Sequence, residues 1–264
     1  MQPSLESVID NLNINKERLE LVAPSSFVDY KDEKDLSSKI SLSSSNGLIQ
    51  KTKKRKAEKA IYEFLALRVW NELLDVYSNC NNLNFRAPKP IGIKGLHNQT
   101  YQSLIMSFIN GHKLKSLSQL KRSTPVKIKN QNEPLPLFSA CAYHLGAFNR
   151  IKEEEGLYHS DYDGRHVIFS PIENVSIGVI DLENSYLDKE RALKESSKIF
   201  NFFKKYVSSP KDKENIESWY KLGLNNLVVP KEGLQTKKII EKLEGEYGIE
   251  FNMHNKRING VRIF

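Results

Sequence analysis

The sequence has few of the residues that mark small secreted proteins or membrane-spanning proteins. Among its 264 residues there are only two cysteines, and Cys80 and Cys141 are too far apart to form a metal-ligand pair. We therefore expect reduced thiols rather than a disulfide framework. No run approaches the roughly 18 apolar residues of a membrane span, and scattered charges near the N-terminus argue against a secretory signal. These absences indicate a cytoplasmic protein, or one at the inner face of a membrane.

The charge is predominantly positive. The formal net charge is +8 and the pI about 9.2, which favours anionic partners such as nucleotide phosphates, nucleic acid or an acidic membrane surface. Basic residues are densest at 51–56, with Lys59 just beyond. No aromatic side chains interleave this cluster, as a stacking platform for nucleic acid requires. A solvated loop is favoured for most of it, with Lys51 treated separately below.

The first half of the chain has the pattern of a small β-rich region with one long helix. Residues 57–78 have apolar side chains at spacings of three and four, which predicts a helix. Polar or glycine-containing breaks separate short segments that are compatible with strands. These predicted strands are 19–30, 38–45, 47–52, 90–94 and 101–108.

The second half is mainly helical around one hairpin. A basic, proline-containing stretch at 121–136 predicts an exposed loop, and helical periodicity begins at 137 and stops at Gly156. Two short apolar segments around 167–169 and 177–180 predict the hairpin. Helices are expected almost directly after Asp181, over 193–207, 216–227 and 235–247. Together the two halves predict an α+β protein.

Two acidic residues stand beside the two short apolar segments. Asp161 precedes the first segment and Asp181 follows the second, twenty positions later. A kinase-type phosphoryl-transfer site needs such a pair, because one carboxylate accepts the proton of an attacking hydroxyl and the other holds the metal that bridges the nucleotide phosphates. A turn-capping role for Asp161 and a helix N-cap role for Asp181 are the alternatives.

The motif around these residues resembles that of atypical protein-kinase-like enzymes. His159-Ser160-Asp161 and Ile180-Asp181-Leu182-Glu183 are similar to the motifs of aminoglycoside and choline phosphotransferases. His166, where most such enzymes carry Asn, is similar to the lipopolysaccharide core kinases. The resemblance implies a two-lobed fold, with Asp161 as the catalytic carboxylate and Asp181 and His166 as metal ligands. It gives His159 an architectural role.

The resemblance also implies a nucleotide-binding lobe over residues 1–108 and a catalytic lobe over 109–264. Lys51 and Glu63 are similar to the lysine and helix glutamate that hold the phosphates, although Lys53 or Lys54 could take the place of Lys51. The backbone of Ser107, Phe108 and Ile109 is expected to meet the adenine edge.

The implied cofactors are ATP and Mg²⁺, or Mn²⁺ because His166 would offer nitrogen. The expected reaction transfers the γ-phosphate to a hydroxyl of a sugar or glycolipid, a small alcohol, or a protein Ser or Thr. No Gly-x-Gly-x-x-Gly loop and no Ala-Pro-Glu segment occurs in the chain. A pseudokinase or nucleotide-binding scaffold is therefore the alternative, and nucleic-acid binding through 51–59 is a third hypothesis.

Overall fold

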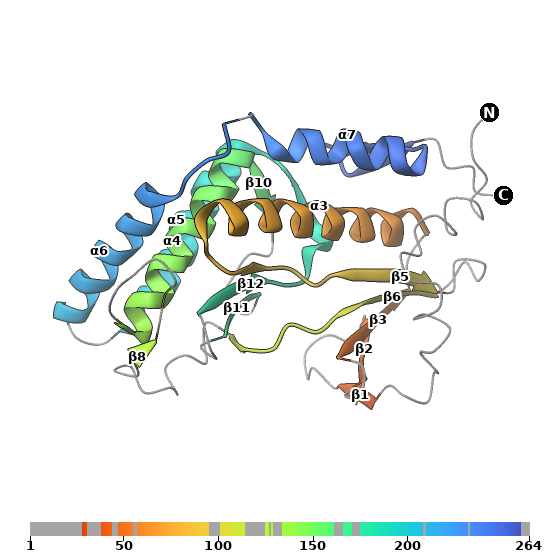
Figure 1. The fold of residues 1–264 in the computed structure, drawn as a ribbon. Helices are drawn as coiled ribbons and strands as arrows, with labels where there is room; N and C mark the ends of the chain where they lie inside the picture. Colours follow the sequence, from red (N-terminus) through yellow and green to blue (C-terminus); the bar gives the residue numbers. More distant parts are fainter. Residues whose placement is uncertain are drawn as a thin grey trace. The chain divides into compact units, whose positions relative to one another are not determined.

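The structure is a computed structural model in which helices and strands both contribute (Figure 1), so the predicted α+β class is confirmed. The chain divides into two compact units. The first holds residues of 1–69, 88–108 and 238–264, and the second those of 70–87 and 109–237. The residues that the structure describes are 28–30, 38–43, 47–54, 57–94, 101–113, 125–126, 128, 134–160, 166–170, 175–207, 210–231 and 233–259.

The first unit is built on an antiparallel sheet in the order β1-β2-β3-β6-β5. The strands lie within or close to the predicted segments, whereas residues 19–27 fall outside the described part of the chain. Gly47, with φ +58, closes the turn into β3 in a conformation that few other residues adopt readily. The strand bounds are β1 Val28–Tyr30, β2 Ser38–Ser43, β3 Leu48–Lys54, β5 Pro90–Lys94 and β6 Tyr101–Ser107.

The predicted long helix is confirmed as α3, Ala57–Asn81, whose residues up to Val69 belong to the first unit. Residues 60–67 are all buried, Ile61 and Phe64 among them, so this part of the helix is covered on every side and not only along the predicted apolar face. The C-terminal part of the chain also packs on this helix, because the ring of Tyr62 lies 5.4 Å from that of Phe251. The C-terminal elements are α7 (Gln235–Tyr247), β14 (Glu250–Asn252) and β15 (Arg257–Asn259).

These units differ in two segments from the lobes predicted at 1–108 and 109–264. Residues 70–87 belong to the second unit and residues 238–264 to the first. The physical reason is that a linear division follows sequence order, whereas α3 continues past Val69 and the C-terminal segment returns to it. Arg68 of α3, for example, donates to the hydroxyl of Tyr247.

In the second unit, a four-stranded sheet has the order β4-β12-β11-β7, and a separate pair joins β10 to β13. The predicted hairpin is confirmed as β11 and β12. Gly111 permits the close approach of β7 to β11, since a Cβ there would lie 2.6 Å from the carbonyl oxygen of Phe169. The strand bounds are β4 Phe85–Arg86, β7 His112–Lys113, β10 Leu157–His159, β11 Val167–Ser170, β12 Ser176–Val179 and β13 Ser185–Leu187.

Two sequence predictions are wrong in this unit. The stretch 121–136 contains a strand pair, β8 (Pro125–Val126) and β9 (Leu135–Pro136), and Val126 is buried. Proline removes a ladder donor, so the pattern indicated a loop. Helices also do not follow Asp181 directly, because a 3₁₀ turn, η3 (Leu182–Asn184), and β13 come first.

The predicted helices of the second unit are α4 (Leu137–Glu155), α5 (Lys189–Lys204) and α6 (Pro210–Asn226). Helix α4 ends at Gly156, which adopts φ 69 and donates its N–H to Lys152 O, as the sequence predicted. No helix in the described ranges is both long enough and apolar enough to cross a membrane.

Helices α4 and α6 pack backbone against backbone (Figure 1). A Cβ on Gly146 would lie 2.1 Å from Tyr220 O, and a Cβ on Gly223 would lie 2.0 Å from Tyr143 O. Real side chains do not fit such distances, so glycine is required at both positions. This contact fixes α4, whose C-terminal end leads directly into β10.

We therefore expect Gly223→Ala to lower the free energy of unfolding by about 1–3 kcal/mol, because the helices must separate. Gly245→Ala is the matched control, since Gly245 is exposed on α7 and a Cβ there meets nothing within 4 Å. That change should stabilise the protein by roughly 0.5–1 kcal/mol. Urea unfolding of the variants measures both, and equal effects would contradict the packing argument.

Candidate functional site

Asp181 has an uncommon backbone conformation at the end of β12. Its φ of 62 and ψ of 52 lie in the left-handed region. This conformation costs a non-glycine residue on the order of 1–3 kcal/mol and persists only where neighbouring contacts enforce it. One such contact is the hydrogen bond from the Ile180 N–H to His166 O, at 3.0 Å. A second comes from His159. The conformation presents the carboxylate, whose side chain is 36% exposed.

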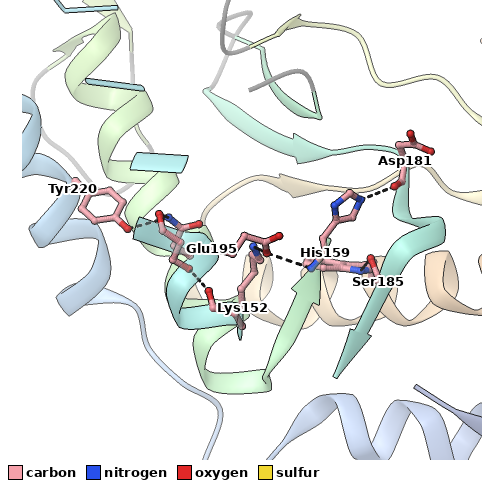
Figure 2. Close-up of polar contacts among 10 residues, drawn as sticks. Lys152, His159, Asp181, Ser185, Glu195 and Tyr220 are labelled. Atoms are coloured by element: carbon pink, nitrogen blue, oxygen red, sulfur yellow. Dashed lines mark hydrogen bonds and ion pairs between the residues drawn. The ribbon is translucent and has the colours of Figure 1, made fainter. Parts of the chain in front are cut away.

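His159 holds the backbone of Asp181. Its ring is fully buried at the end of β10, and Nε2 bonds the carbonyl oxygen of Asp181 (Figure 2). A carbonyl only accepts, so the proton is assigned to Nε2. Burial lowers the pKa of His159 to about 4, which leaves the imidazole neutral near pH 7. This geometry suits the architectural role that the sequence suggested.

His166 and Asp181 come together at the proposed metal position. His166 Nε2 lies 3.7 Å from Asp181 Oδ2, too far for a hydrogen bond. One carboxylate and one imidazole fit a divalent cation that takes its other ligands from phosphate and water. Within the described ranges, no group of three or more His, Cys, Asp or Glu residues forms a protein-only metal cage.

Asp161 lies in the segment 161–165, outside the described residues, so its catalytic role stays a prediction. The structure does describe the two residues before it. His159 is held as above, and the Ser160 N–H points to Asn184 O at 3.4 Å. Ser160, the last described residue before Asp161, therefore lies beside the 3₁₀ turn that follows Asp181.

Sequence reasoning missed an ion pair behind His159. Lys152 in α4 pairs with Glu195 in α5, and Oε2 of Glu195 also accepts the backbone N–H of His159 at 3.2 Å (Figure 2). Burial lowers the pKa of Lys152 and raises that of Glu195. A lysine near the C-terminal end of a helix is a common surface feature, so nothing in the sequence indicated that this one is buried.

In the first unit, the structure pairs Lys51 of β3 with Glu63 of α3. The Nζ to Oε1 distance is 3.0 Å, and the two residues are only 6% and 1% exposed. Lys51 therefore does not belong to an exposed basic patch. The side chains of Lys53 and Lys54 fall outside the described part.

The segment expected to meet adenine has two of its three amides engaged within the protein. The Ser107 N–H donates to Lys89 O at 2.9 Å, and the Phe108 N–H donates to Gly47 O at 2.8 Å. From their backbones, Ser107 and Phe108 can therefore offer only carbonyl oxygens to the edge of a base. For Ile109, no hydrogen bond of the amide to another described residue occurs.

Buried histidines make stability depend on pH. His144 and His159 each have a pKa lowered to about 4 by burial, against about 6.5 when unfolded. The unfolded chain thus binds more protons between these values, and each histidine contributes stability that is present above pH 6.5 and lost toward pH 4. We expect His144→Gln to reduce the slope by up to about 1.4 kcal/mol per pH unit. Unfolding of both proteins across this range tests it, and parallel curves would refute it.

No protein-family model and no curated protein matches the chain. Among solved structures, "WaaP in complex with acyl carrier protein" is 14% identical with a TM-score of 0.46 and covers 88% of each chain. The bifunctional kinase-methyltransferase WbdD is 12% identical with a TM-score of 0.43, covering 78% of this chain and 47% of that one.

Proposed function

We propose that the protein is an ATP-dependent phosphotransferase of the two-lobed kinase-like kind, which moves the γ-phosphate to a hydroxyl acceptor. The conformation of Asp181 carries the proposal. The chain holds this residue in a strained backbone state, bonded through its carbonyl to a buried neutral histidine, and directs its carboxylate toward His166. Strain of this kind is concentrated at functional sites.

Within the second unit, Asp181 and His166 would hold Mg²⁺ or Mn²⁺, and a bound divalent ion would neutralise charge on the phosphates. Asp161 would accept the proton of the acceptor hydroxyl as its oxygen bonds to the γ-phosphorus. The bond between that phosphorus and the β–γ bridging oxygen breaks, and ADP leaves with its electron pair. His159 takes no proton in this scheme because it is buried and neutral.

Within the first unit, Lys51 would bind the α- and β-phosphates. Glu63 orients its ammonium through the buried ion pair. The carbonyl oxygens of Ser107 and Phe108 would meet the adenine edge, since the amides of these two residues are already engaged. Ile109, the third residue proposed for adenine, belongs to the second unit.

The acceptor is proposed as a sugar or glycolipid, a small alcohol, or a protein hydroxyl, and the net charge of +8 favours an acceptor that carries negative charge. A cytoplasmic location supplies ATP and suits the free thiols of Cys80 and Cys141.

The direct test is turnover of ATP with Mg²⁺ or Mn²⁺ in the presence of candidate acceptors. Asp161→Asn should lower kcat by roughly 10²–10⁴-fold because the base is lost. Asp181→Asn should abolish both turnover and metal-dependent thermal stabilisation by ATP, while asparagine still tolerates the left-handed backbone. Lys194→Met, on the exposed face of α5, is the matched control and should behave as wild type.

Full activity of both asparagine variants would reject the assignment. Metal-dependent stabilisation of the wild type by ATP without turnover would favour the pseudokinase alternative. Salt-sensitive binding of generic DNA or RNA, with no response to ATP, would favour a nucleic-acid function instead.

A further inference from the structure

A buried ion pair lies directly behind the candidate site. The side chain of Lys152 is fully buried near the C-terminal end of α4, and that of Glu195 in α5 is 6% exposed. Both residues come from helices whose other buried residues nearby are largely apolar, such as Ile151 and Ile199. Two charges are thus removed from water together.

Stability alone is a weak reason for such a pair. Desolvation of two charges costs about as much as their attraction returns, and well-packed apolar residues of similar volume are often as stable or more so. The two helices are also joined by another contact, because Asn149 of α4 donates to Ser196 O of α5 at 3.2 Å. Contact between α4 and α5 therefore does not depend on the ion pair.

Glu195 has a second partner that points to the site. The oxygen that binds Lys152, Oε2, also accepts the backbone N–H of His159. From the same residue, the imidazole reaches Asp181 O (Figure 2). His159 thus connects the ion pair to the strained Asp181. Its amide donates to Glu195, and its ring binds the carbonyl oxygen of Asp181.

The opposite edge of β10 has its own anchor. His159 pairs in register with Ser185 of β13, and Ser185 Oγ accepts a hydrogen bond from Trp70 Nε1 at 3.1 Å. This contact fixes β13, whereas Glu195 fixes the amide of His159 itself. The Lys152 ammonium in turn binds the shared carboxylate oxygen.

We propose that Lys152 and Glu195 are positioning residues for the phosphoryl-transfer site. They fix the position of His159, and through it the backbone of Asp181. The expected effect on kcat rests on the proposed function, whereas the expected effect on the position of His159 does not.

The test compares two variants that both lack the buried ammonium. Lys152→Met/Glu195→Gln keeps an oxygen that can accept the His159 N–H, whereas Lys152→Met/Glu195→Leu removes it at similar side-chain volume. We expect melting temperatures within about 5 °C of each other. We expect kcat for ATP turnover to fall roughly 10–100-fold in the leucine variant, as for the loss of other supporting contacts. The glutamine variant should stay within about threefold of wild type, with KM for ATP little changed in either.

An exposed ion pair on the same helix is the control. Lys194 and Glu190 of α5 lie 2.7 Å apart with both side chains mostly exposed. Lys194→Met/Glu190→Leu makes the matching change away from the site and should leave kcat as in wild type.

If the leucine variant at 195 does not fold, Glu195→Asp replaces it, because the shorter carboxylate keeps its charge and loses reach to His159. Equal kcat in the variants that keep and lose the acceptor would overturn the proposal.

A second readout separates this inference from the proposed function. In protein labelled with ¹⁵N-histidine, the signals of His159 can be identified by their loss in His159→Asn among the six histidines. The leucine variant should shift the amide and ring signals of His159, and the glutamine variant should largely preserve them. If wild type turns over no ATP, the proposed function fails, and this spectrum alone decides the positioning. Unchanged His159 signals in the leucine variant would overturn it.

Discussion

The candidate site depends on one hydrogen bond, from a buried neutral imidazole to a main-chain oxygen. His159 can make it because burial disfavours its protonated form, so that the ring stays a single donor to Asp181 O. Without this bond, the left-handed conformation at Asp181 would have one less contact to enforce it. The backbone that carries the candidate carboxylate is therefore held in part by a residue that need not touch substrate.

Helix packing in the second unit supports this bond at a distance. Gly146 lets the backbones of α4 and α6 approach closely. Further along α4, Lys152 binds the Glu195 oxygen that also accepts the His159 N–H. At the end of the same helix, Glu155 accepts the N–H groups of Gln235 and Thr236 and caps α7. One helix thus connects the packing of the unit with the geometry of its candidate site.

Much of the fold could be predicted from local pattern. The helix that became α3 was predicted because its apolar spacing is regular, and Gly156 because helices often end at a left-handed glycine. The short strands β8 and β13 were missed, since two- or three-residue pairings leave little periodic signal and proline argues against them. Of the site, Asp181 was predicted from motif and order. Glu195 was not, because its role arises from a contact with His159 across 36 positions of sequence.

At position 181, the backbone conformation and the proposed chemistry favour different residues. Its backbone favours glycine, which adopts positive φ without strain, whereas its proposed chemistry needs a carboxylate. Selection for a more stable fold alone would replace the aspartate, and selection for phosphoryl transfer would keep it at a cost to stability. The φ of 62 at Asp181 is thus the cost in stability that the proposed chemistry requires at this position.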